Sequence, residues 1–494
     1  MTRAAALLCA LALAGCTVGP DYRRPAAAVI NLTTARGDFA GLSQGPFVRT
    51  PPPGRWWELY HDPQLDGLIA EALTANTDLR VASANIARAQ AGRELESAAR
   101  YPATTASAGV AYSRLSPQER LLPNVDLPAT FVYDLGAGLS YQVDLFGQIR
   151  RAVEQANADV AATRAAYDAT RITVVAQTTL AYSAACSAGR EISIARKSID
   201  LQARSSVLTE TLFRAGRGTA LDVARAAALE NRVRATVPPL EAARRVALYR
   251  LAVLTGRPPA EFSQTVAACV LEPRLTQPIP VGDGGALLAR RPDVRRAEYL
   301  LHAATAGVGV ATADLYPKVV LGTSVGSIGP TSAFLDYSTA KYSLGPLISW
   351  EFPNRRLAKA RIHGAGADVD AAFAQFDGTV LEALREAETA LTTYAHDLDQ
   401  RRLLQLSRDQ AALAARDADK LFRLGRETYL SVLEADIALV SADQALAALD
   451  TSIAADQVTV FLALGGGWET GNGVVVGGDF SEPVDPHIGE VERK

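Results

Sequence analysis

The stretch LFRAGRGTALDVARA, residues 212–226, aligns without a gap to LFRLGRETYLSVLEA, residues 421–435. Nine of the fifteen positions are identical, at an offset of 209 residues. Two shorter matches lie upstream at an offset of 215, where DLR at 78–80 corresponds to DVR at 293–295 and YP at 101–102 to YP at 316–317. Three collinear matches over half of the chain indicate a tandem duplication.

Two segments in each copy alternate apolar residues with polar or small ones. The clearest covers about 132–144, and the others cover about 104–113, 318–328 and 341–352. In the clearest segment one side carries Tyr133, Leu135, Ala137, Leu139, Tyr141 and Val143. Alternation over roughly 10 residues is typical of a tilted membrane strand with one side on lipid and the other on water. Polar loops at 113–129 and 329–340 are expected to join the strands of each pair.

Helical patterns surround these strands. Segments 64–99 and 286–315 are expected to be helices that stop at the Tyr-Pro pairs, because the residue before proline disfavours helix. After the strands, an apolar stripe at three- and four-residue spacing predicts a helix over 356–424, about 100 Å long. The first copy offers a matching helix over 149–214. Helices at 219–256 and 428–464 are expected to run back as long hairpins, the first of them kinked at Pro238 and Pro239.

The four predicted strands cannot close a barrel within one chain. The smallest single-chain membrane barrels use about eight strands, and an open sheet edge in lipid leaves backbone groups without hydrogen bonds. Two copies would give a barrel filled by side chains, whereas three would give twelve strands and room for a lumen. The sequence therefore predicts an oligomer, and a conduit favours three copies.

The N-terminus reads as an export signal. Residues 1–15 have one positive charge, Arg3, and an apolar core too short to span a bilayer. The ending LAGC at 13–16 resembles a bacterial lipobox, which implies cleavage before Cys16 and acylation of its thiol. Thr17 follows where an aspartate would retain the protein in the inner membrane, so the resemblance implies the outer membrane. A plain signal peptide with a chance cysteine is the alternative.

Two further cysteines remain in the mature chain, Cys186 and Cys269. In an oxidising periplasm they could form a disulfide, and two buried free thiols would fit equally well. After the signal no apolar run reaches the ~18 residues of a spanning helix, so a membrane crossing would require a closed β-barrel.

Composition and motifs argue against other classes of protein. The chain has 50 basic and 53 acidic side chains, and phosphate binding needs a basic surplus, so nucleic acid is not an expected partner. No Walker A, GxSxG or HExxH motif occurs. The five histidines (His61, His302, His363, His396 and His487) fall at no metal-ligand spacing. We therefore expect no enzyme activity, no metal and no cofactor besides a lipid on Cys16.

Several short motifs together resemble the TolC-like outer-membrane efflux factors, in particular their NodT-type lipoprotein branch. They are CTVGPDY at 16–22, WW at 56–57 with DP at 62–63, NTDL at 76–79, DLFG at 144–147 and RRPDVRRAE at 290–298. The resemblance extends from Cys16 to about residue 466. It implies a mixed α and β membrane protein. Its homotrimer would form a 12-stranded outer-membrane β-barrel, four strands per chain, continuous with a periplasmic coiled-coil barrel of twelve helices.

The same resemblance implies a function. The trimer would be the passive exit duct for small molecules such as drugs in a tripartite efflux system. Its partners would be a periplasmic adaptor and an inner-membrane pump of the RND type, which supplies the energy.

The resemblance also suggests gate residues near the second hairpin tip. Leu430 matches the family's constricting apolar position, and Glu434 its acidic ring position, where three copies would favour cations. An ordinary solvated glutamate explains Glu434 as well. Phe422 stands where some members have a gating tyrosine. Arg225 occupies the repeat-equivalent position of Glu434 and is the candidate salt-bridge partner, with Asp222 one turn earlier able to hold it. Ile437 replaces the arginine that some members carry.

The hairpin tips are the expected contact with the adaptor. Their residues are Arg214, Gly216 and Arg217 in the first copy, and Arg423, Gly425 and Arg426 in the second. A helix C-cap with cations near the negative end of the helix dipole explains the same residues structurally.

The predicted organisation is a signal peptide (1–15), a lipid anchor and linker (16–60), the first copy (61–285), the second copy (286–465) and a disordered tail (466–494). Two other functions stay open. One is a protein-secretion duct, and the other is a lipid-anchored periplasmic coiled-coil scaffold whose strands would pack in a soluble sandwich.

Overall fold

The computed structural model of the chain describes residues 17–114, 128–275, 277–350 and 355–466. The expected signal peptide, the lipidation site Cys16 and nearly all of the expected disordered tail lie outside the described residues. The chain forms two compact units, and four of the boundaries between them, after residues 80, 167, 294 and 379, fall inside helices. The first unit contains residues 81–167 and 295–379 with the N-terminal arm, and the second contains 29–80, 168–294 and the remainder.

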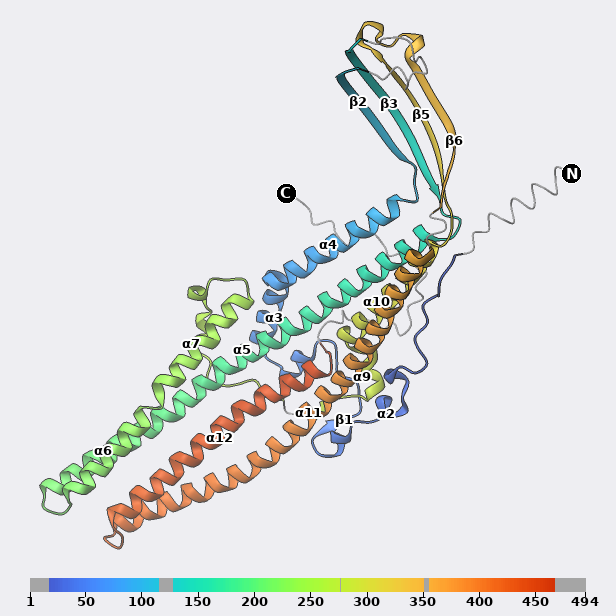
Figure 1. The fold of residues 1–494 in the computed structure, drawn as a ribbon. Coiled ribbons are helices and arrows are strands. Elements are labelled where there is room, and N and C mark those ends of the chain that lie inside the picture. Colours follow the sequence, from blue (N-terminus) through green and yellow to red (C-terminus); the bar gives the residue numbers. More distant parts are fainter. Residues whose placement is uncertain (1–16, 115–127, 276, 351–354, 467–494) are drawn as a thin grey trace. The chain divides into compact units, whose positions relative to one another are not determined.

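The first unit holds one antiparallel sheet of four strands in the order β2-β3-β5-β6 (Figure 1). The strands are β2 (Ala103–Ser113), β3 (Thr130–Val143), β5 (Lys318–Pro330) and β6 (Ala340–Ser349). They lie where the alternating segments predict them, although residues 351 and 352 of the fourth prediction fall outside the described range. All four form a single sheet, which is not the sandwich that the scaffold alternative requires.

The register brings like faces together across the sheet. Tyr133 lies opposite Val110 and Gly329, and Val325 opposite Ala137 and Tyr342. Directly opposite residues in an antiparallel pair project to the same side. One face is therefore apolar along all four strands, and the other carries mainly glycine, serine and threonine with a few charged side chains.

The helices follow the duplicated order. The first copy has α3 (Pro63–Ala75), α4 (Thr77–Ala98), α5 (Gln148–Arg214), α6 (Ala220–Arg234) and α7 (Val237–Leu254). The second has α9 (Gly284–Arg290), α10 (Pro292–Ala313), α11 (Arg355–Arg423) and α12 (Tyr429–Ala463). Short elements complete the second unit: α2 (Thr33–Arg36), α8 (Gln264–Ala267) and the parallel pair β1 (Phe47–Val48) and β4 (Ile279–Pro280). Within the described ranges, none of the helices combines the length and apolarity needed to cross a membrane.

Three predicted helices are wrong in detail. The first returning helix is not one kinked helix, since α6 ends at Arg234 and α7 starts at Val237. Pro238 and Pro239 lie in the first turn of α7, where no helical hydrogen bond needs their missing N–H. The segments 64–99 and 286–315 are each two helices, interrupted at Asn76 and at Arg291.

The largest apolar core lies in the second unit. It includes the Trp56-Trp57 pair of a short 3-10 helix, Trp56–Tyr60, and both indoles are buried. The ring of Trp56 stacks on Phe461 of α12, with centroids 4.7 Å apart. The tryptophan motif therefore fixes the linker against the end of the second returning helix.

Candidate functional site

The polar face of the sheet carries few charges. Near the loop end, Lys341 of β6 donates to Asp134 of β3 over 2.6 Å. Further along lie the small residues Gly138, Ser324 and Ser343, and the two serine hydroxyls are 2.7 Å apart. This face is lined by small and polar side chains, whereas the opposite face exposes large apolar side chains such as Tyr342 and Leu344.

The N-terminal arm is bound at the point where β3 becomes α5. The N–H of Val18 donates to the carbonyl oxygen of Phe146 over 3.2 Å. A Cβ on Gly147 would lie 2.7 Å from Cγ2 of Thr17, so the glycine of the DLFG motif makes room for the arm. Arg151, almost fully buried, donates to Asp21 over 2.6 Å. Residue 17, the neighbour of Cys16, is thus fixed at the strand-to-helix junction.

Both hairpin tips end in the same backbone motif. Gly216 and Gly425 adopt left-handed conformations, with φ of 70° and 69°. The N–H of Arg217 donates to Leu212 over 2.8 Å, and the N–H of Arg426 to Leu421 over 2.9 Å. These are Schellman caps, which satisfy carbonyls at the helix ends.

The arginine side chains of the tips are exposed. Arg214 pairs with Glu210 of its own helix at 2.8 Å, and Arg423 pairs with Asp419 at 2.9 Å. Exposed pairs of this kind contribute little to stability. The tips therefore offer cationic turns to solvent or to a partner.

The expected gate residues lie where α6 and α12 pack together above the tips. A small apolar core joins the two helices, formed by Ala226, Leu229, Val233, Tyr429, Val432 and Leu433. Leu430, Glu434 and Arg225 are exposed outside this core. Among the described residues of one chain, no ion pair joins Arg225 to Glu434, so this latch stays a prediction about the assembled protein.

Asp222 has a structural role that the sequence reasoning did not anticipate. It forms a capping box with Thr219, in which its carboxylate accepts from the backbone N–H at 3.1 Å and from the hydroxyl at 2.6 Å. These hydrogen bonds lower the pKa of Asp222, and the charge of Arg225 adds a smaller effect in the same direction. Asp222 therefore starts α6 and only secondarily faces Arg225.

Tyr429 is the residue that the sequence reasoning missed. Its ring packs edge-on against Phe422, with centroids 5.7 Å apart, and its hydroxyl hydrogen-bonds to Ser205 of α5. Nearby, Gln202 of α5 donates to Asp436 of α12 over 3.3 Å. The hydroxyl of Tyr429, seven residues after Phe422, therefore connects α12 of the second hairpin to α5 of the first. The repeat alignment held a signal, since the first copy has Ala220 at this position.

A charge cluster joins the hairpins far from the tips. The buried carboxylate of Asp450 on α12 accepts from Arg401 at 2.6 Å, from Arg190 of α5 at 2.8 Å and from Arg274 at 3.1 Å. Arg190 also donates to the buried Glu272 at 2.5 Å.

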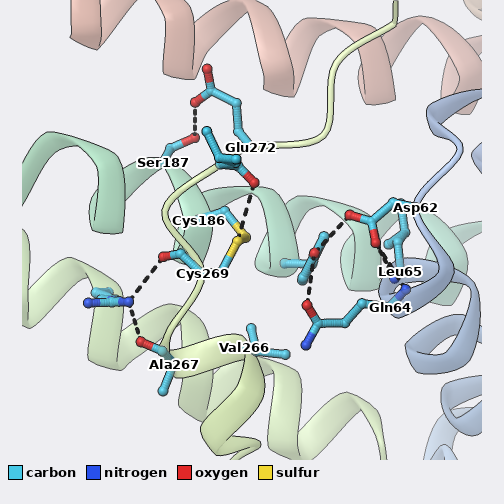
Figure 2. Close-up of a disulfide and its surroundings, with 12 residues drawn as sticks. Asp62, Gln64, Leu65, Cys186, Ser187, Val266, Ala267, Cys269 and Glu272 are labelled. Atoms are coloured by element: carbon cyan, nitrogen blue, oxygen red, sulfur yellow. Dashed lines mark hydrogen bonds between the residues drawn. A yellow bond between two sulfur atoms is a disulfide. The ribbon is translucent and has the colours of Figure 1, made fainter. Parts of the chain in front are cut away.

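Glu272 lies in the connector between α7 and α9, and this connector is also fixed covalently. Cys186 of α5 forms a disulfide with Cys269, which resolves the alternative that the sequence left open. Figure 2 shows the disulfide beside Ser187, whose hydroxyl donates to Glu272 over 2.9 Å. The connector is thus held to α5 by a covalent bond and by ion pairs.

The comparisons with known proteins agree with this arrangement. The family model described as "Outer membrane efflux protein" matches residues 68–257 and 285–466, once for each copy. The chain belongs to the outer membrane efflux protein family.

Individual members of the family match over nearly the whole chain. The probable efflux pump outer membrane protein TtgC of Pseudomonas putida is 28% identical, covering 93% of this chain and 94% of TtgC. The probable outer membrane lipoprotein SilC of Salmonella typhimurium is 27% identical, covering 92% and 96%. The solved structure of the outer-membrane channel OprN is 35% identical, with a TM-score of 0.83, covering 92% of this chain and all of the OprN chain.

Membership in this family confirms the main expectations from the sequence. The resemblance to TolC-like efflux factors is confirmed, and so are the function in efflux at the outer membrane and the location there. The family is one of efflux ducts and not of enzymes. The long helices and the four-stranded sheet of this outer membrane efflux protein match the fold of the solved OprN channel.

Proposed function

We propose that three copies of the chain close a 12-stranded barrel in the outer membrane and a coiled-coil tunnel in the periplasm. The trimer is the passive exit duct of a tripartite system for small molecules. A periplasmic adaptor contacts the tips, and an RND-type inner-membrane pump drives transport.

The observation that carries the proposal is the two-faced sheet with two open edges. Within the described part of the chain, β2 and β6 each pair on one side only. An open edge in hydrocarbon would leave a row of N–H and C=O groups without partners, at several kcal/mol for each group. Pairing β6 of one copy with β2 of the next removes every edge at once. It also turns all the polar faces towards one lumen.

The helices support assembly independently. Of the 22 residues of α4, only Leu79 is buried in the single chain. Val81 is 61% exposed and Leu95 is 73% exposed. A long helix with so little contact to its own chain requires neighbours. Adjacent copies of the same chain provide them in a tunnel of packed helices.

The gate in this proposal combines the expected residues with Tyr429. Leu430 narrows the lumen, and three copies of Glu434 form an acidic ring that favours cations. Arg225, beside Asp222, ties Glu434 of an adjacent hairpin. Phe422 supports Tyr429, whose hydroxyl holds α12 against α5 through Ser205.

The arm places the lipid of Cys16 at the membrane. Thr17 is fixed where β3 ends and α5 begins, and this is the level at which the barrel would leave the bilayer. An acyl chain on residue 16 would then enter the inner leaflet without pulling the arm away. The exposed tips, with Arg214, Arg217, Arg423 and Arg426, contact the adaptor.

Disulfide cross-linking between edge strands tests the trimer. One cysteine replaces Ala106, Ala108 or Val110 on β2 in turn, and a second replaces Leu344 on β6. Oxidation of membranes should give dimers and trimers in denaturing gels for at least one pair. In the matched control, the first cysteine replaces Leu135 on the central strand β3 instead of a residue on β2. This variant should stay monomeric. Monomers throughout the panel would contradict the barrel.

Single-channel recording tests the gate. Arg225→Ala and Glu434→Gln trimers in planar bilayers should conduct more than the parent, because each loses one side of the proposed ion pair. Unchanged conductance in both variants would remove the Arg225–Glu434 latch from the proposal and leave the barrel in place.

A further inference from the structure

The loop between β5 and β6 is folded back onto the apolar face of the sheet. Tyr133 projects from that face, yet it is only 1% exposed because the loop covers it. Its hydroxyl lies 2.7 Å from Oγ of Ser327 and 2.8 Å from Oγ1 of Thr339, and it accepts from the N–H of Leu335 over 2.8 Å. The sequence predicted a polar loop at residues 329–340, whereas this loop packs on the apolar face of the sheet. The phenol of β3 therefore binds the middle of the loop at Leu335 and its C-terminal end at Thr339.

Two backbone features adapt the loop to this position. A Cβ on Gly329 would lie 2.5 Å from Cγ2 of Thr339, so only glycine allows the loop to approach. Leu335 has a φ of 60°, a conformation that bulky residues rarely adopt. The hydrogen bond from its N–H to Tyr133 holds it there. The folded-back position is thus specified by the chain at several points.

The loop presents apolar side chains outwards. Phe334, Leu335 and Tyr337 are 59%, 61% and 95% exposed. The ring of Phe334 packs against Tyr133, with centroids 4.9 Å apart. On the same face, Tyr342 and Leu344 of β6 are 89% and 84% exposed. The loop therefore extends the apolar surface of the sheet and gives it an aromatic border.

Position and charge indicate what covers this surface. The loop is held by β3 and β5, the two inner strands, whereas neighbouring copies would join at β2 and β6. Asp336 is the only charged residue in 330–340, and its carboxylate accepts from the N–H of Ser338 over 2.9 Å. Residues 330–340 therefore offer apolar and aromatic contacts and no cation for a phosphate group. Aromatic side chains prefer the boundary between head groups and acyl chains.

We propose that Phe334, Leu335 and Tyr337 form an interfacial anchor that inserts into the outer leaflet of the outer membrane. Tyr133 is the positioning residue that clamps this loop to the lipid-facing side of the sheet. The anchor sets the depth of the sheet in the leaflet. This inference rests on the proposed barrel, whose apolar face it assigns to lipid.

Spin labelling of the full-length trimer in phosphatidylcholine bilayers tests the anchor. A nitroxide is attached at Tyr337→Cys, with Leu344→Cys as the lipid-face control and Ser343→Cys as the polar-face control. Collision with oxygen, which concentrates in lipid, is compared with collision with a water-soluble nickel chelate. The label at 337 should resemble the label at 344, with oxygen preferred over nickel.

The controls separate the two proposals. If the label at 337 collides with nickel as the label at 343 does, while the label at 344 still prefers oxygen, the anchor is overturned and the barrel stands. If the label at 344 also prefers nickel, the lipid-facing sheet itself is overturned.

A second pair of variants tests the clamp. Tyr133→Phe keeps the ring against Phe334 and removes the hydroxyl that binds the loop. The label at 337 should then lose its preference for oxygen and become more mobile. Tyr141→Phe, on the same strand and the same face, should leave the label unchanged. An unaltered label in Tyr133→Phe trimers would overturn the positioning role of Tyr133.

Discussion

Nη1 of Arg291 donates a hydrogen bond to the carbonyl oxygen of Ala463 over 2.8 Å. Ala463 is the last residue of α12, and Arg291 lies at the interruption between α9 and α10. In the first copy, Nδ2 of Asn76 donates to the carbonyl oxygen of Leu254 over 3.1 Å. Leu254 ends α7, and Asn76 separates α3 from α4. The two copies therefore share one contact between helices, which we call the joint: Arg291 makes it in the second copy and Asn76 in the first. In each copy the end of the returning helix is satisfied by the residue between the two preceding helices.

The two joints should differ in strength. Arg291 also pairs with Asp293 at 2.6 Å and with Glu386 of α11 at 2.8 Å, and its side chain is only 10% exposed. Arg291→Leu should cost about 3–5 kcal/mol, because it leaves carboxylates and a carbonyl without their donor. Asn76→Ala should cost roughly 1–3 kcal/mol through the one unsatisfied carbonyl and the lost helix cap.

Thermal melting of detergent-solubilised trimers measures this difference. Arg402→Ala is the control, since that exposed side chain pairs with the exposed Asp399 of its own helix. Equal losses of melting temperature for Arg291→Leu and Asn76→Ala would contradict the assignment.

The cluster around Asp450 should be the strongest link between the hairpins. Burial raises the pKa of Asp450, but hydrogen bonds from Arg401 and Arg190 outweigh it, so the pKa lies below its ordinary value. A carboxyl with a lowered folded-state pKa stabilises the protein above its unfolded pKa, about 3.9, and this contribution is lost as pH falls further. Asp450→Asn should lower the melting temperature strongly at neutral pH, by the equivalent of about 3–5 kcal/mol, and little in acid. Asp443→Asn, which breaks one partly exposed pair with Arg408, should have a much smaller effect.

Local patterns in the sequence account for the elements but not for their joints. The strands were predictable because a period of two is visible within ten residues, as at 132–144. The interruption at Arg291 had a local signal, since Pro292 suits the first turn of a helix. Its reason is not local, because Ala463 and Glu386, two of the partners of Arg291, are 172 and 95 residues away. The same distance problem hid Tyr429 and Ser205, which are 224 residues apart. The spacing of Cys186 and Cys269 could not decide their pairing. The loop at 329–340 was predicted to be polar because glycine, proline, serine, threonine and aspartate dominate its sequence. Its exposed aromatic residues, Phe334 and Tyr337, stand singly among them and form no periodic pattern.

Asp456 gives α12 a response to pH near neutrality. Burial raises the pKa of Asp456 to about 7, and the neighbouring carboxyl of Asp397 contributes through a hydrogen bond and through its charge. Because the folded pKa lies above the unfolded one, the folded protein binds more protons between about pH 4 and 7, and stability falls as pH rises through that range.

Asp456→Asn should therefore melt higher than the parent above pH 7, and the advantage should disappear below about pH 4. Asp436→Asn on the same helix is a useful comparison, since burial also raises the pKa of Asp436 while Gln202 opposes it. An Asp456→Asn advantage that does not vary with pH would show that the effect is not protonation.

Tyr429 should control leakage through the closed duct. Tyr429→Phe keeps the ring against Phe422 and removes the hydrogen bond to Ser205, so α12 loses one of its polar contacts with α5 near the tip. The loss of one such bond costs only about 0.5–1.5 kcal/mol, and the trimer should remain folded. Single trimers in planar bilayers should conduct more than the parent, because in the proposed gate this bond holds α12 against α5 and keeps the tip closed. Ser205→Ala should raise conductance to a similar extent, and the double variant should add little to either single change, as expected for two partners in one interaction.

Tyr249→Phe, on α7 and away from the tips, serves as the control. If the increase in conductance of the double variant equals the sum of the increases of the two single variants, the two residues act separately.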